Sequence, residues 1–170
     1  MQSSIQVGVN GKAVWVKVEG KGNFLNSGNL KEFAREMVQR GYREFVVDLE
    51  HCAMMDSTFM GTMAGVALRL KEIGHGHLHV VHCGTRSREL LTGLGLDQIF
   101  QIHVNGSSAP QCEILSSAST ADASAEKQQQ AQQMLDAHEA LCEAAPENFS
   151  RFKDVLDYLK QDLQKESTAK

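Results

Sequence analysis

The sequence predicts an α/β fold in which a mixed β-sheet packs against helices and a helical extension follows at the C-terminus. Residues 5–18 alternate apolar and polar side chains around an Asn-Gly pair, which is typical of a β-hairpin. Apolar segments of strand length then alternate with amphipathic helical segments as far as residue 104. The hairpin pairs its strands antiparallel, whereas the strand–helix–strand units connect parallel strands by right-handed crossovers. Together they predict a mixed sheet.

The predicted elements of the first part follow in chain order. Residues 5–9 and 14–18 are the two strands of the hairpin, and Asn10 and Gly11 are predicted to take positive φ angles in its turn. The apolar stripe of residues 30–38 predicts a helix. The remaining predicted elements are a strand at 45–49, a helix with its inner face at 60–68 that stops before Gly74, a strand at 78–82, a short helix near 87–92 and a strand at 100–104.

The second part of the chain differs in composition. Residues 105–124 are rich in Ser and Ala and are predicted to be a linker. Residues 125–170 carry two amphipathic stripes, which predict a helical hairpin. We therefore expect a sheet domain at 1–104 and a hairpin that either clamps onto this domain or joins two chains into a homo-oligomer.

Composition and charge exclude several functional classes. The 170 residues have a formal net charge of −4, and because phosphate binding needs a basic face, we expect no nucleic-acid partner. The uncharged run at 57–68 is too short to cross a membrane, and the first residues do not resemble a signal peptide. The four cysteines form no CxxC pair. We expect a cytoplasmic protein with reduced thiols and no membrane insertion.

The most informative segment lies where the second predicted helix begins. A buried strand ends near Leu49, a short loop follows, and Asp56 is placed to cap the next helix. Ser57 would then stand at a helix N-terminus on the carboxyl edge of the sheet, where α/β proteins usually present functional groups.

Two motifs in this part resemble the STAS domain of bacterial anti-sigma factor antagonists. Segment 46–49 (VVDL) leads into 55–58 (MDST), and 88–96 (RELLTGLGL) leads into 99–100 (IF). The resemblance covers most of residues 5–104. It implies a STAS-like fold and partner switching, in which the antagonist binds an anti-sigma factor that is also a serine kinase.

The resemblance also implies roles for individual residues. The kinase would phosphorylate Ser57 and so break the complex, and a phosphatase would restore the free hydroxyl. The implied partner-binding residues are Met55, Asp56, Ser57, Thr58 and Phe59. Phe59 stands where the family usually has glycine, so its side chain is expected either to narrow which kinase can approach or to mark a divergent member with another partner.

The sequence leaves two alternative functions. The first is a non-switching, STAS-type structural or scaffolding subunit of a larger assembly or transporter, recruited through the C-terminal helices. The second is an enzyme with Ser57 as nucleophile. The sequence lacks a Gly-x-Ser-x-Gly motif, and no histidine stands at a recognisable spacing from Ser57. We therefore expect no enzymatic activity and no cofactor.

Four histidines at positions 75, 77, 79 and 82 form the one cluster that resembles a metal site. His77 and His79 would share one face of a strand, but His75 lies in a Gly turn, and no Asp or Glu is expected to join them. We therefore expect solvated or core imidazoles and no bound metal.

Overall fold

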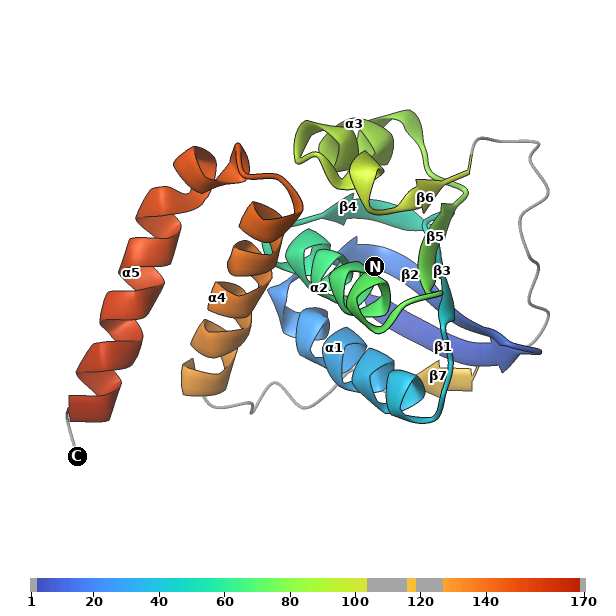
Figure 1. Cartoon of the computed structure of the whole chain (residues 1–170), viewed down its shortest axis with the longest axis horizontal. Coiled ribbons are helices and arrows are strands. Elements are labelled where there is room, and N and C mark those ends of the chain that lie inside the picture. Colours follow the sequence, from blue (N-terminus) through green and yellow to red (C-terminus); the bar gives the residue numbers. More distant parts are fainter. Residues whose placement is uncertain (1–2, 104–115, 119–126, 169–170) are drawn as a thin grey trace.

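Figure 1 shows the computed structural model of the chain, which describes residues 3–103, 116–118 and 127–168. The strands are β1 (Ser4–Asn10), β2 (Ala13–Gly22), β3 (Glu44–Asp48), β4 (Cys52–Met55), β5 (His77–Val81), β6 (Gln101–Ile102) and β7 (Ser116–Ala118). The helices are α1 (Phe24–Gln39), α2 (Ser57–Ile73), α3 (Thr85–Gly93), α4 (Lys127–Ala144) and α5 (Asn148–Thr168), with a 3₁₀ turn η1 (Leu96–Gln98).

The strands form a mixed sheet, as predicted. Their order is β6-β5-β3-β2-β1-β7, and β4 pairs with the far end of β2. β1 pairs antiparallel with β2 and β7, whereas β2–β3, β3–β5, β5–β6 and β2–β4 are parallel. β4 lies in a segment that the sequence predicted to be a loop.

The hairpin is confirmed, but its turn differs from the prediction. Asn10 pairs with Ala13, so the two turn residues are Gly11 and Lys12. Gly11 has a φ of 62°, whereas Asn10 remains in the strand. The predicted positive φ at Asn10 was wrong because the ladder extends one residue further, and only glycine takes the left-handed conformation at this turn without steric cost.

Alternation along the strands separates two apolar clusters. Inward residues such as Val16 and Phe45 pack with α1 and α2 in the main core. On the other face Trp15, Val46 and Val81 form a smaller cluster. This arrangement places α1 and α2 on one face of the sheet, where their N-termini come together.

The C-terminal helices form a hairpin that packs on the sheet domain. Figure 1 shows α4 beside α2 and α1, with α5 beyond it. Leu141 of α4 is fully buried in the main core. A separate cluster joins α4 to α5 through Ala131, Leu135, Leu156 and Leu159. Of the two expected uses of the hairpin, the structure contains the clamp onto the domain.

Much of the segment predicted as a linker, 105–124, lies outside the described residues. Its residues 116–118 form β7 and extend the sheet beside β1. Among the helices that the structure describes, none combines the length and apolarity needed to cross a membrane.

Candidate functional site

The start of α2 is held in place by the end of β2. The parallel pairing of β4 with Gly20–Gly22 brings the chain alongside β2, and the Asp56 backbone N–H donates to the Gly22 carbonyl at 2.9 Å. Asp56 is extended, with φ −91° and ψ 172°, so it lies outside α2 as its N-cap. This geometry places Ser57 at the first residue of the helix, as predicted.

The carboxylate of Asp56 connects two helices. Its Oδ1 accepts a hydrogen bond from the Phe59 N–H at 2.8 Å, which caps α2. Its Oδ2 accepts one from the Phe24 N–H at 2.9 Å, at the first residue of α1. Both oxygens are therefore engaged by backbone, and the charge remains within the first turn of α2.

The hydroxyl of Ser57 is engaged by the C-terminal extension. Ser57 is half-buried, and its Oγ lies 2.9 Å from Nε2 of His138 in α4. Nδ1 of His138 lies 2.6 Å from the Met134 carbonyl, which can only accept, so Nδ1 carries a proton. In the neutral imidazole Nε2 is then the acceptor, and Ser57 donates to it. His138 is 4% exposed and packs edge-on against Phe152.

The other three predicted partner-binding residues are buried. Met55 and Thr58 are 3% and 6% exposed, and Phe59 is inaccessible. The ring of Phe59 lies directly against Gly22, where a Cβ would come within 2.7 Å of it. Phe59 thus projects into the core, which corrects the expectation that it narrows the approach of a kinase.

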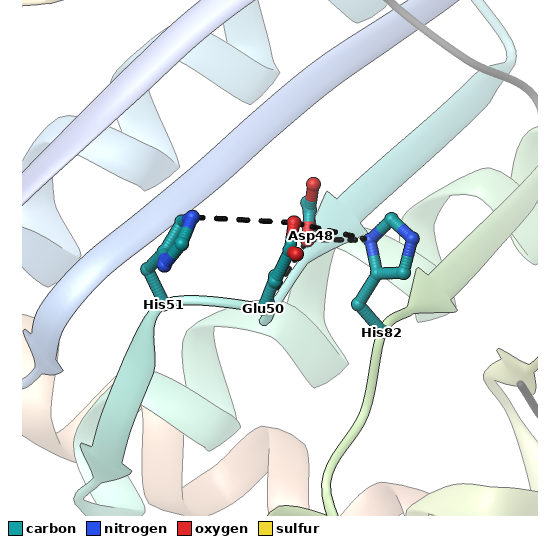
Figure 2. Close-up of polar contacts among 4 residues, drawn as sticks. All are labelled: Asp48, Glu50, His51 and His82. Carbon is teal, nitrogen blue, oxygen red and sulfur yellow. Dashed lines mark hydrogen bonds and ion pairs between the residues drawn. The ribbon is translucent and has the colours of Figure 1, made fainter.

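A second polar cluster lies at the same carboxyl edge of the sheet (Figure 2). Nδ1 of His82 lies 3.0 Å from Asp48 Oδ1 and 4.0 Å from Glu50 Oε2, and His51 flanks Glu50 at 4.0 Å. Asp48, Glu50 and His82 each offer a ligand atom within 4.8 Å of the others, so they are the described residues that could hold a divalent cation. Glu50 and His82 are exposed, and Asp48 Oδ1 is already used by the Glu50 N–H.

Three further histidines, His77, His79 and His103, form a chain of contacts with Glu44, and His75 is not part of it. Glu44 accepts from His77 at 2.9 Å and from His79 at 2.7 Å, and His79 contacts His103 at 2.9 Å. The expectation that no acidic residue accompanies the histidines was wrong. Glu44 and Asp48 come from the neighbouring strand, where local sequence spacing does not reveal them.

The thiols near the site are unreactive in character. Cys52, Cys83 and Cys142 are free, and Cys112 lies outside the described residues. Burial raises the pKa of the Cys52 and Cys83 thiols above their ordinary value. Both sulfurs are therefore protonated at neutral pH and are poor nucleophiles.

His138 is the site residue that sequence reasoning missed. In the sequence it belongs to the first amphipathic stripe of residues 125–170 and lies 81 residues from Ser57. The available signal was a histidine on the predicted apolar face of a helix, among Ala131, Leu135 and Leu141. A buried imidazole requires a hydrogen-bond partner, and the site supplies the hydroxyl.

Comparison with known proteins identifies the sheet domain. The family model of the STAS domain matches residues 4–109. A putative anti-sigma factor antagonist from Thermotoga maritima aligns with a TM-score of 0.55 at 17% identity, over 60% of this chain and 87% of that one. No curated protein sequence matches significantly.

Two structures of SpoIIAA share the fold as well. The anti-sigma factor antagonist SpoIIAA in its unphosphorylated form aligns with a TM-score of 0.51 at 14% identity, over 59% of this chain and 88% of that one. The Bacillus cell fate determinant SpoIIAA in its phosphorylated form gives 0.50 at 15% identity, over 60% and 93%. These matches cover about three fifths of the chain, which is about the length of the sheet domain.

Proposed function

This chain belongs to the STAS domain family, and from that premise we propose that it is an anti-sigma factor antagonist switched by phosphorylation of Ser57. Unphosphorylated protein binds an anti-sigma factor that is also a serine kinase. Phosphorylated protein releases it, and a phosphatase returns Ser57 to the hydroxyl form. The observation that carries the proposal is the position of Ser57, half-buried at the first residue of α2 and directly after a cap that fixes it.

The position suits a residue that alternates between two charge states. The kinase transfers the γ-phosphoryl group of ATP to Ser57 Oγ; the hydroxyl proton leaves, the new O–P bond forms and ADP departs. The modification adds a charge of about −1.5 to −2 and three acceptor oxygens. The N-terminal end of α2 favours negative charge, so the fold tolerates the phosphorylated state.

The same negative charge is unfavourable at the interface with a docked partner. The partner surface has given up water to meet a neutral hydroxyl, and a buried charge without a partner costs several kcal/mol in effect. A change of about 1.4 kcal/mol is a tenfold change in affinity. The carboxylate of Asp56, one residue away, adds repulsion. In this proposal Asp56 and Ser57 face the partner, and Met55, Thr58 and Phe59 support them from the core.

The Ser57–His138 pair resembles an activated serine nucleophile, but its surroundings do not favour catalysis. His138 is 4% exposed, and the Phe59 N–H, which could stabilise an oxyanion, is occupied by Asp56. A cavity of about 340 Å³ lies between α1, α2 and α4, yet neither Ser57 nor His138 lines it. We therefore assign the pair to regulation.

The test uses the serine-kinase anti-sigma factors of the source organism, purified and incubated one by one with this protein and ATP. Peptide mapping by mass spectrometry should place phosphate on Ser57, and Ser57→Ala should abolish it. In pull-downs Ser57→Ala should retain the kinase, and Ser57→Asp should release it. Equal binding of both variants would favour the non-switching scaffold, and ester hydrolysis lost in Ser57→Ala would favour the enzyme.

A further inference from the structure

The surface of α2 beside Ser57 is covered by α4 of the same chain. The Ser57 hydroxyl donates to His138, and one turn further along α2 the backbone of α4 lies against Gly61. A Cβ on Gly61 would overlap the carbonyl group of Ala137, which belongs to the backbone of α4 and cannot rotate away. The two helices therefore touch at a point where only glycine fits.

The hairpin is held on the domain by further polar contacts, one beside Ala137 and others near the start of α5. Lys31 of α1 forms a 3.0 Å ion pair with Asp136 of α4. At the turn between α4 and α5, the buried Asn148 side chain donates to the Leu94 and Leu141 carbonyls at 2.8 Å each. Arg151 adds a bond to the Gly93 carbonyl at 2.6 Å. The Arg151 bond is exposed and the ion pair is only part-buried, so both contribute less than the buried bonds of Asn148.

We propose that α4 is an autoinhibitory helix, which must leave the Ser57 surface before a kinase or an anti-sigma factor can reach it. The kinase must place the γ-phosphorus of ATP in line with Ser57 Oγ, and Nε2 of His138 already lies 2.9 Å from that oxygen. The inference rests on the proposed function for the identity of the partner. The covering of Ser57 itself rests on the contacts of this chain.

Phosphorylation and docking of α4 exclude one another for the same reason. Once the phosphoryl group replaces the hydroxyl proton, Ser57 Oγ has nothing to donate to His138. Its new oxygens also need space that the imidazole fills. Release of α4 thus permits phosphorylation, and phosphate then prevents the return of α4. The hairpin and the partner compete for one surface. The free energy of releasing the hairpin therefore reduces the apparent affinity of the partner.

Two glycines in α2 provide a matched pair of variants. Gly61→Ala places a methyl group against the α4 backbone, whereas Gly65→Ala places one 3.8 Å from the Ala140 side chain, an ordinary contact. Both substitutions favour the α2 helix by the same intrinsic amount. The two variants differ only in whether the new methyl group displaces α4. A difference between them therefore reports the displacement of α4.

The primary experiment measures access to position 57 without a kinase. Ser57→Cys is made in the full chain, alone and combined with either glycine variant, and reaction of the introduced thiol with a maleimide is followed by peptide mapping. Gly61→Ala should raise the labelling rate at least tenfold, and Gly65→Ala should change it less than twofold. Equal rates in all three proteins would overturn the proposal. Asn148→Ala, which loosens the hairpin elsewhere, should also raise the rate and replaces Gly61→Ala if that variant does not fold.

The second experiment separates this proposal from the proposed function. With a cognate kinase, Gly61→Ala should raise the rate of Ser57 phosphorylation at least tenfold over wild type. If no kinase modifies Ser57 in any variant, the antagonist function fails while labelling still decides the covering role. Hydrogen exchange of α4 should accelerate in phosphorylated protein. Slower exchange would mean that phosphate pairs with His138 and tightens the hairpin, which contradicts mutual exclusion.

Discussion

Asp56 Oδ2 accepts a hydrogen bond from the backbone N–H of Phe24 at 2.9 Å, so the residue that caps α2 also holds the first residue of α1. The other oxygen caps α2 through the Phe59 N–H. One carboxylate thereby sets the relative position of two helix N-termini, and Ser57 is placed directly beside it. The acidic residue of the MDST motif thus has a structural role that is independent of any partner.

Asp56→Ala should lower the free energy of unfolding by about 1–3 kcal/mol, because two backbone donors lose a charged acceptor. Asp56→Asn should cost less, since its single carbonyl oxygen can still accept one of the two bonds. Chemical denaturation of the three proteins measures this series. Ser150→Ala, which removes an exposed hydroxyl bonded to the nearby Glu147 carbonyl, is the control and should change stability by less than about 0.5 kcal/mol. Equal stabilities of wild type and Asp56→Ala would contradict the double cap.

His138→Ala should destabilise the protein by about 1–3 kcal/mol, because the Ser57 hydroxyl loses its acceptor and Phe152 loses a packed ring. His51→Ala is the matched control. His51 is exposed and its nearest charged contact, Glu50, lies 4.0 Å away, so its loss should cost at most about 0.5 kcal/mol. Thermal unfolding followed by circular dichroism distinguishes them. A His138→Ala melting curve that coincides with that of His51→Ala would show that the buried bond is not stabilising.

Local periodicity predicted most of the fold, because each strand and helix buries a face that its own sequence encodes. The hairpin, α1, β3 and α2 were recovered in this way. β4 was not, since its four residues alternate weakly and its pairing with the end of β2 is a tertiary event. The contact of Ser57 with His138 was missed for the same reason: it depends on how two distant helices pack, which neither motif nor spacing records. Glu44 and its histidines meet across parallel strands and were also missed.

Phe59 and Gly22 should show strong energetic coupling. Phe59→Ala removes an inaccessible ring and should cost about 3–5 kcal/mol, and Gly22→Ala should cost about 1–3 kcal/mol because its methyl group meets the same ring. In the double variant the methyl group occupies space that the ring vacated. The combined loss should therefore be smaller than the sum of the two single losses. Denaturation midpoints of the four proteins complete the cycle, and additive losses would refute direct contact.

Stability should fall in acid partly through Glu44. Partial burial raises the pKa of Glu44. Hydrogen bonds from His77 and His79 and the charges of both rings lower it by more than burial raises it, so the net pKa lies below its ordinary value. A carboxyl with a lower pKa in the folded state than in the unfolded state binds fewer protons when folded. It therefore stabilises the fold above its unfolded pKa of about 4.5 and loses this contribution as the pH falls through the folded pKa.

Glu44→Gln should remove that part of the pH dependence. At pH 7 the variant should be less stable by about 0.2–1 kcal/mol, because the carboxylate is partly exposed and its ion pairs are screened. Between pH 5 and about pH 3 its free energy of unfolding should decline less steeply than that of wild type, so the two curves converge. Glu36→Gln, which removes an exposed carboxylate paired with Arg40 on the surface of α1, is the control for the loss of one charge. Urea unfolding across this range measures the slopes. Wild-type and Glu44→Gln curves that stay parallel down to the lowest pH would exclude Glu44 as a source of the acid sensitivity.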